Sequence, residues 1–110
     1  MNLYVESSAI LALLLGETRG ATVEKLLGRA DNVVASEILL LECDRALIRG
    51  EGLGVISSAQ AGNQRAAVSR ESAFWTLIRI EGEVMERARR PFPLEPVRAL
   101  DALHLATLLT

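Results

Sequence analysis

Short apolar segments that can form strands alternate along this chain with longer segments that have helical periodicity. The segments with strand character are Asn2–Val5, Val33–Ala35 and Trp75–Ile80. Helices are predicted between and after them at Ala9–Leu15, Ala21–Ala30, Ser36 to about Arg49, Ile56–Phe74, Glu81–Arg90 and Pro96–Thr110. Parallel strands need long crossover connections, which are usually helical. The alternation therefore predicts an α/β domain with a short parallel sheet.

Length and composition limit the fold further. A chain of 110 residues fits one domain with one core, so residues 1–110 are expected to form a single domain. Half of the residues are apolar and only 4% are aromatic, which predicts a mainly aliphatic core. The formal net charge of −2 gives no overall attraction to nucleic acid, so such binding would need a local basic patch.

Cysteine usage and hydropathy indicate the compartment. Cys43 is the single cysteine, which excludes an intrachain disulfide and a cysteine zinc site and suits a reducing cytoplasm. The apolar run Ala9–Leu15 is too short to span a bilayer, and no basic leader precedes it. We therefore expect a cytoplasmic protein without membrane contact.

Three acidic residues stand at positions where a carboxylate needs an explanation. Glu6 follows the first strand, Glu42 lies among apolar positions of a helix, and Asp101 has Val97 and Leu105 four residues to either side. A carboxylate on an apolar face is costly unless it has a partner. Ligands of parallel sheets collect beyond the carboxyl ends of the strands. The pattern predicts that the three acids meet in a pocket around Mg²⁺ or Mn²⁺, or that they face inward by chance and pair with arginines.

Other residues allow two interpretations each. His104 either touches this site or a phosphate, or is a hydrogen-bonded core histidine. Arg45, Arg49 and Arg98 either bind phosphates or pair with nearby acids. Trp75 is predicted to be an anchor of the core or of a dimer, and Cys43 to be a small packing residue.

Three segments resemble the signature segments of PIN-domain nucleases, and most of all those of VapC-like ribonuclease toxins of type II toxin–antitoxin systems. They are "NLYVESSAILALLLGE", "VVASEILLLECDRAL" and "VRALDALHLATLL", in that order along the chain. The resemblance implies a three-layer α/β/α domain and a magnesium- or manganese-dependent ribonuclease that hydrolyses RNA. It also implies a cognate antitoxin and a homodimer. Position by position, the catalytic and metal-binding acids fall on Glu6, Glu42 and Asp101, and a supporting small polar residue falls on Ser8.

The chain departs from this family pattern in two respects. The family usually has aspartate at the position of Glu6, and a misplacement of about 1 Å can cost on the order of a hundredfold in rate. The family also carries a further acid on a strand beyond the last helix, whereas this sequence stops at Thr110. Either the sequence is a truncated form, or the domain works with three acids, or it no longer cleaves RNA. We therefore expect a domain without the last strand, with one unpaired sheet edge, weak cation binding and slow or no RNA cleavage.

Two alternatives belong to other functional classes. A degenerate PIN-like module would keep the antitoxin or dimer surface without catalysis. A phosphoacceptor signalling domain would need further acids beside Glu6 and a later lysine, but Lys25 is the single lysine and comes too early. Self-association is expected in either PIN-like case, because the Ala9–Leu15 helix and the long helical pair carry more apolar surface than a small monomer covers.

Overall fold

A computed structural model of the chain describes residues 1–109, and these contain three strands and six helices. The strands are β1 (Asn2–Val5), β2 (Asn32–Ser36) and β3 (Thr76–Ile78). The helices are α1 (Ser7–Leu14), α2 (Gly20–Arg29), α3 (Ile38–Gly52), α4 (Ser58–Ser72), α5 (Gly82–Ala88) and α6 (Ala99–Leu108). Each predicted element is present. The first strand has its predicted bounds, and the ends of the other elements are shifted. Thr110, which the predicted last helix included, lies outside the described residues.

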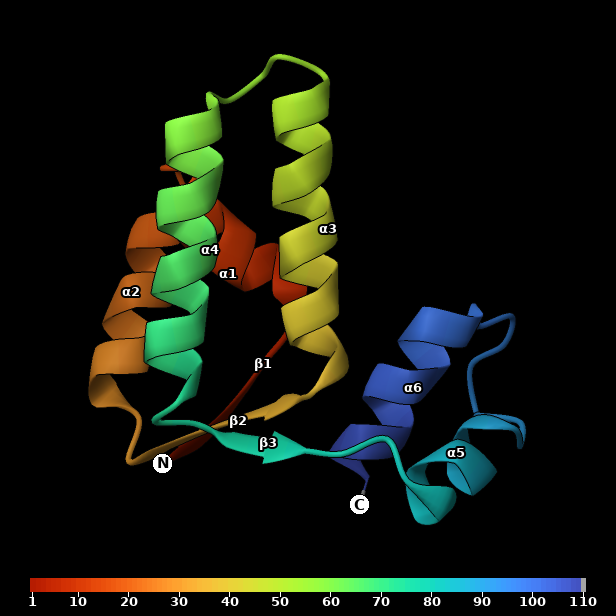
Figure 1. Cartoon of the computed structure of the whole chain (residues 1–110). Helices are drawn as coiled ribbons and strands as arrows, with labels where there is room; N and C mark the ends of the chain where they lie inside the picture. The colour runs from red at the N-terminus through yellow and green to blue at the C-terminus, as the bar shows by residue number, and fades with distance from the viewer. Residues whose placement is uncertain (110) are drawn as a thin grey trace.

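The strands form one parallel sheet in the order β1-β2-β3 (Figure 1). Val5 of β1 is in register with Ala35 of β2, and Ala35 is in register with Leu77 of β3. The carboxyl ends of all three strands therefore lie along one edge of the sheet. Within the described residues β1 pairs with β2 only, so its other edge has no strand beside it.

Side chains alternate between the two faces of this sheet, because successive residues of a strand point in opposite directions. One face joins α1, α3 and α4 in a core that is mainly aliphatic, built from Val5, Ile10, Ala35, Leu39, Cys43 and Val68. Tyr4 points to the opposite face, where its hydroxyl meets His104 of α6. The three-layer α/β/α prediction is confirmed, with α1–α4 on one side and α6 on the other.

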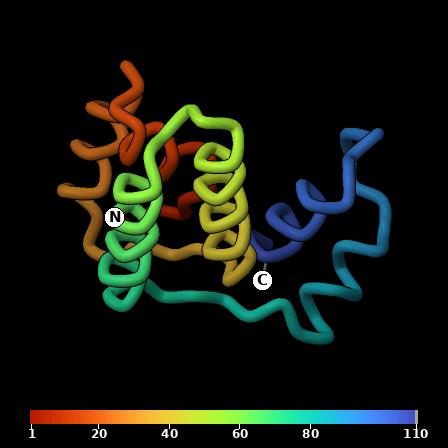
Figure 2. Tube along the Cα trace, turned by 45° about the horizontal axis from the view of Figure 1, so that its top comes forward, coloured from red at the N-terminus to blue at the C-terminus, as the bar shows by residue number. Residues whose placement is uncertain are grey.

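The helices pack in hairpin pairs. The extensive helix contacts join α1 with α2, α3 with α4, α5 with α6, and α1 with α3. Figure 2 shows α5 and α6 together at one end of the molecule, set apart from α1 and α2. The second helical layer is therefore a small unit that packs chiefly on itself.

Glycine allows the tight approach of α2 to α1. A Cβ atom on Gly20 would lie 2.7 Å from the carbonyl oxygen of Ala12, which is too close for any other residue without a shift of the backbone. Gly16, at φ +67°, supplies the left-handed turn between the two helices. These two glycines thus bracket the turn between α1 and α2.

The last helix differs from its prediction in two ways. It begins at Ala99, not with Pro96 in its first turn, because Arg98 still has the extended backbone of an N-cap residue. Leu100, Leu105 and Leu108 recur at helical spacing and so predict an apolar inward face, but this face is not the buried one. Leu100 and Leu108 are 50% and 57% exposed. The buried side chains are the small ones, Ala102, Ala106 and Thr107, and Asp101 is exposed among the leucines.

Candidate active site

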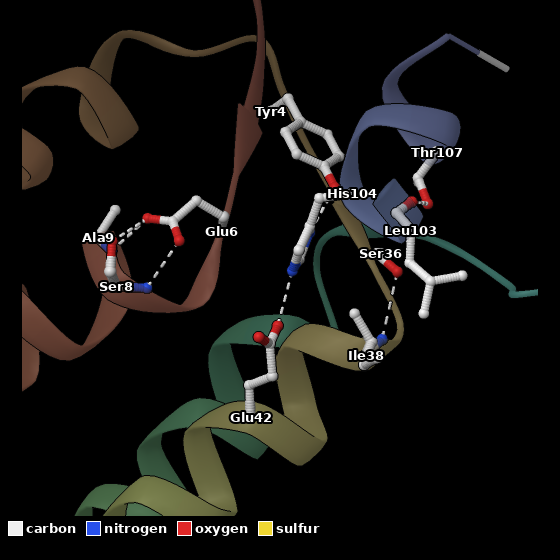
Figure 3. Close-up of polar contacts among 10 residues, drawn as sticks. All are labelled: Tyr4, Glu6, Ser8, Ala9, Ser36, Ile38, Glu42, Leu103, His104 and Thr107. Carbon is white, nitrogen blue, oxygen red and sulfur yellow. Dashed lines mark hydrogen bonds and ion pairs between the residues drawn. The ribbon is translucent and has the colours of Figure 1, made fainter. Parts of the chain in front are cut away.

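The carboxylate of Glu6 caps helix α1 (Figure 3). It accepts hydrogen bonds from the backbone N–H groups of Ala9 at 2.9 Å and Ser8 at 3.1 Å, and the Ser8 hydroxyl donates to it as well. Serine caps helices more often than glutamate does, so the sequence favours Ser7 or Ser8 as the cap, and this prediction is wrong. The extended backbone at Glu6 lets its longer side chain fold back over the first turn, where the N–H groups have no helical partner.

These contacts set the charge of Glu6. Burial raises the pKa of its carboxyl, but the hydrogen bonds from the Ser8 hydroxyl and from the N–H groups of Ser8 and Ala9 outweigh that effect. The nearby His104 lowers the pKa further, so the net value lies below that of an ordinary glutamate. Glu6 is therefore a carboxylate anion at neutral pH, and Ser8 supports it directly.

A chain of hydrogen bonds joins β1, α6 and α3. The Nε2 atom of His104 lies 2.7 Å from Oε1 of Glu42, and its Nδ1 atom lies 3.0 Å from the hydroxyl of Tyr4 (Figure 3). His104 is half-buried. The rings of Tyr4 and His104 are arranged edge to face, with their centroids 6.4 Å apart. His104 is hydrogen-bonded as one interpretation predicted, but it is not a core residue, because it is only half-buried and lines a surface hollow together with Glu6 and Asp101. Tyr4 was not among the predicted site residues, although its alternation with Leu3 and Val5 indicates that it leaves the core face.

Glu6 and Asp101 face the same hollow. Its volume is about 330 Å³, and its lining residues are Tyr4, Glu6, Asp101, His104, Leu105 and Leu108. The third predicted acid, Glu42, does not line the hollow. It bonds to His104, which does line it. None of the ion pairs within residues 1–109 joins an arginine to any of the three acids. The described residues therefore do not show the alternative in which the three acids face inward by chance and pair with arginines.

The donor chemistry of this hollow fits a hard divalent cation, because Glu6 and Asp101 offer only oxygen ligands. Across the described residues, however, no three histidine, cysteine or acidic side chains are grouped closely enough to hold a metal ion. Glu6 is engaged by the α1 cap, and Glu42 is engaged by His104. The hollow thus brings together two of the three predicted ligands, and the three-acid site remains a prediction.

The remaining candidates divide into core residues and exposed arginines. Cys43 is fully buried, and burial, together with nearby Glu42 among other acids, raises the pKa of its thiol to about 12. Trp75 packs against the core. Arg45, Arg49 and Arg98 are exposed, and no ion pair in the described part of the chain includes them. A role for these arginines with phosphates stays a prediction.

Comparisons with known proteins agree with the fold. The family model for the PIN domain matches residues 3–110. Ribonuclease VapC46 of Mycobacterium tuberculosis is 33% identical over 106 residues, which are 96% of this chain and 72% of that relative. The crystal structure of M. tuberculosis VapC20, a toxin that cleaves the sarcin–ricin loop, has a TM-score of 0.67 at 20% identity. That match covers 97% of this chain and 81% of the VapC20 chain. Over residues 1–109, no helix has the length and apolar character needed to cross a membrane.

Proposed function

We propose that this chain, which belongs to the PIN-domain family, is an endoribonuclease of the VapC type that hydrolyses phosphodiester bonds in RNA. One observation carries the proposal. Glu6 and Asp101 are far apart in the sequence, yet both line one hollow beyond the carboxyl end of β1. The 33% identity to ribonuclease VapC46 supports RNA as the substrate.

The chemistry follows from the residues of the hollow. Mg²⁺ or Mn²⁺ held by Glu6 and Asp101, with Glu42 close by, would lower the pKa of a bound water and stabilise charge on the phosphate. The hydrogen bonds that Glu6 accepts lower the pKa of its carboxyl further below neutral pH, so the group offers a charged oxygen ligand. His104 bonds to Tyr4 and Glu42. It is therefore not arranged to activate a serine or cysteine for covalent catalysis.

We further propose a cognate antitoxin and a homodimer in a reducing cytoplasm. Large apolar side chains stand in solvent, among them Phe74 at 86% exposure, Leu41 at 59% and Leu15 at 45%. Such side chains are typical of surfaces that contact another protein. Light scattering at micromolar concentration should give the mass of a dimer, and a monomer would contradict this part of the proposal.

A second candidate function is a degenerate PIN-like module that binds its partner but does not cleave RNA. The observation that favours it is the absence, within the described residues, of any three side chains grouped around a possible cation. The engagement of Glu6 in the helix cap points the same way.

Cleavage of a mixed RNA pool in the presence of manganese separates the two candidates. We expect slow cleavage that a chelator stops and that Asp101→Asn abolishes, because this change removes the charge and keeps the shape. The matched control is Asp44→Asn, which alters an acid paired with Arg65 outside the hollow and should leave cleavage unchanged. Cutting that persists with chelator, or an Asp101→Asn variant as active as the parent, would contradict the proposed mechanism. A parent that binds an antitoxin and never cuts RNA would favour the degenerate module.

A further inference from the structure

We infer that His104 is a positioning residue, which holds helix α6 so that Asp101 faces Glu6 across the hollow. The inference rests on the proposed function for its effect on rate, whereas the attachment of α6 can be measured without RNA. In this inference, the hydrogen bonds to Tyr4 and Glu42 hold the ring of His104 in one orientation.

Helix α6 buries only small side chains, Ala102, Ala106 and Thr107, so apolar contact contributes little to holding it in place. The helix contacts α5 extensively, but it turns Leu100, Leu105 and Leu108 outward at 50%, 38% and 57% exposure. The hydroxyl of Thr107 is buried, yet it donates to the carbonyl of Leu103 in its own helix at 2.6 Å. Within the described residues, the side-chain hydrogen bonds that leave α6 for another element both belong to His104.

The two anchors of His104 lie on different elements of the better packed region. Tyr4 is on β1, two residues before Glu6, and Glu42 is on α3. Residues three apart on a helix share a face. Fixing the ring of His104 therefore also fixes the rotation of α6 that sets the direction of Asp101. The imidazole of His104 is thus linked to all three acids. It bonds directly to Glu42, it follows Asp101 by three residues on α6, and its partner Tyr4 precedes Glu6 by two residues.

The hydrogen bonds of His104 use both ring nitrogens. A carboxylate accepts only, so the Nε2–H of His104 donates to Glu42, and Nδ1 shares a hydrogen bond with the hydroxyl of Tyr4, a group that can donate or accept. Burial raises the pKa of Tyr4, a backbone hydrogen bond with Ser36 partly offsets this rise, and Glu42 and Glu6 add to it, so the hydroxyl keeps its proton at neutral pH. Both ring nitrogens are then satisfied, and neither is free to rotate away without losing a partner.

Three variants test this assignment. Tyr4→Phe removes only the hydroxyl, His104→Leu removes both hydrogen bonds, and His104→Gln retains an amide donor near the position of Nε2. The matched control is Thr76→Val, which removes a hydroxyl that bonds to Asn32 at 3.1 Å between β3 and β2. If His104→Leu fails to fold, Tyr4→Phe keeps the test decisive because it changes little volume.

Hydrogen exchange of the metal-free protein is the first measurement. Amides of α6 should exchange about tenfold faster in Tyr4→Phe and His104→Leu than in the parent, since a lost hydrogen bond makes local opening easier. Amides of α3 should be unchanged, and His104→Gln should lie between the parent and His104→Leu. Unchanged α6 exchange in both Tyr4→Phe and His104→Leu would overturn the inference, whether or not the parent cleaves RNA.

The second measurement is the rate of RNA cleavage under saturating and limiting substrate. We expect kcat to fall in His104→Leu with KM little changed, and His104→Gln to recover part of the loss, because misplaced groups slow the chemical step more than they weaken binding. Thr76→Val should have the same kcat and the same KM as the parent. Equal kcat values in the parent and His104→Leu would overturn the positioning role. A parent without activity would instead count against the proposed function, and the exchange data would still decide the attachment of α6.

Discussion

The two halves of the candidate site come from regions that are packed in opposite ways. Glu6 and Glu42 belong to the sheet and the α1–α4 layer, where Leu39 and Cys43 are 0% exposed. Asp101 belongs to the α5–α6 unit, in which α6 buries only small side chains such as Ala102 and Ala106. The first region is held by apolar burial, and the second is attached to it through the hydrogen bonds of His104.

This difference shows how a site can combine rigid and adjustable ligands. Glu6 follows a strand of the core and caps a helix, so its place is set by two elements at once. Asp101 is exposed on a helix that turns its leucines to solvent. A change in the core should therefore alter stability, whereas a change around α6 should alter the geometry of the hollow more than the stability of the fold.

Truncation of a leucine in each region gives the largest contrast. Leu39→Ala should lower the free energy of unfolding by about 2–5 kcal/mol, because it opens a cavity in a fully buried site. Leu108→Ala should change it by less than about 0.5 kcal/mol, since that side chain is 57% exposed. Urea denaturation measures both values. Equal losses would show that α6 is packed as tightly as α3, which would break the comparison.

A pair of glycine substitutions gives the next largest contrast. A Cβ at position 20 would meet backbone at 2.7 Å, so Gly20→Ala should cost about 1–3 kcal/mol of unfolding free energy. A Cβ at Gly82, in α5, meets nothing within 4 Å, so Gly82→Ala should be neutral or stabilise the protein by up to about 1 kcal/mol. Thermal unfolding monitored by circular dichroism measures the change in stability of both variants. A stable Gly20→Ala variant would mean that α1 and α2 can move apart easily.

A smaller effect is expected from alkaline titration of Cys43. Its pKa is raised from 9.0 to about 12 in the folded state, so the folded protein keeps a proton that the unfolded chain loses. The stability that this thiol contributes is therefore complete below pH 9 and is lost as the pH rises toward 12. At pH 10 the loss should be about 1 kcal/mol relative to a Cys43→Ala variant. A difference between the two proteins that does not change with pH would indicate that water reaches the core at α3.

Burial patterns explain which features could be predicted from the sequence. Leu39 and Cys43 lie four residues apart on a helix, so helical periodicity predicted this element, and the apolar run Asn2–Val5 predicted the first strand. The same reasoning failed on α6, because Leu100 and Leu108 are periodic but exposed, while the face that packs is made of alanines. Periodicity records which residues share a face, and it does not say which face has a neighbour.

The polar part of the site was harder to predict for a different reason. The cap by Glu6 was missed because serine is the commoner capping residue, and Glu6 was considered only as a ligand. The bonds of His104 to Tyr4 and Glu42 join residues 100 and 62 positions apart. Local sequence patterns carry no information on such pairs. The three acids could therefore be named from their positions in the sequence, but their contacts could not be predicted.

Amide NMR during a manganese titration tests most directly whether Glu6 and Asp101 act on one cation. The paramagnetic ion broadens signals close to it. We predict that the amides of Ser8 and Ala9, beside Glu6, and of Ala102 and Leu105, beside Asp101, broaden together at the same low manganese concentration. In Asp101→Asn both sets should stay sharp at that concentration. Broadening of one set without the other, or equal broadening around an exposed acid such as Glu83 of α5, would contradict a shared cation site.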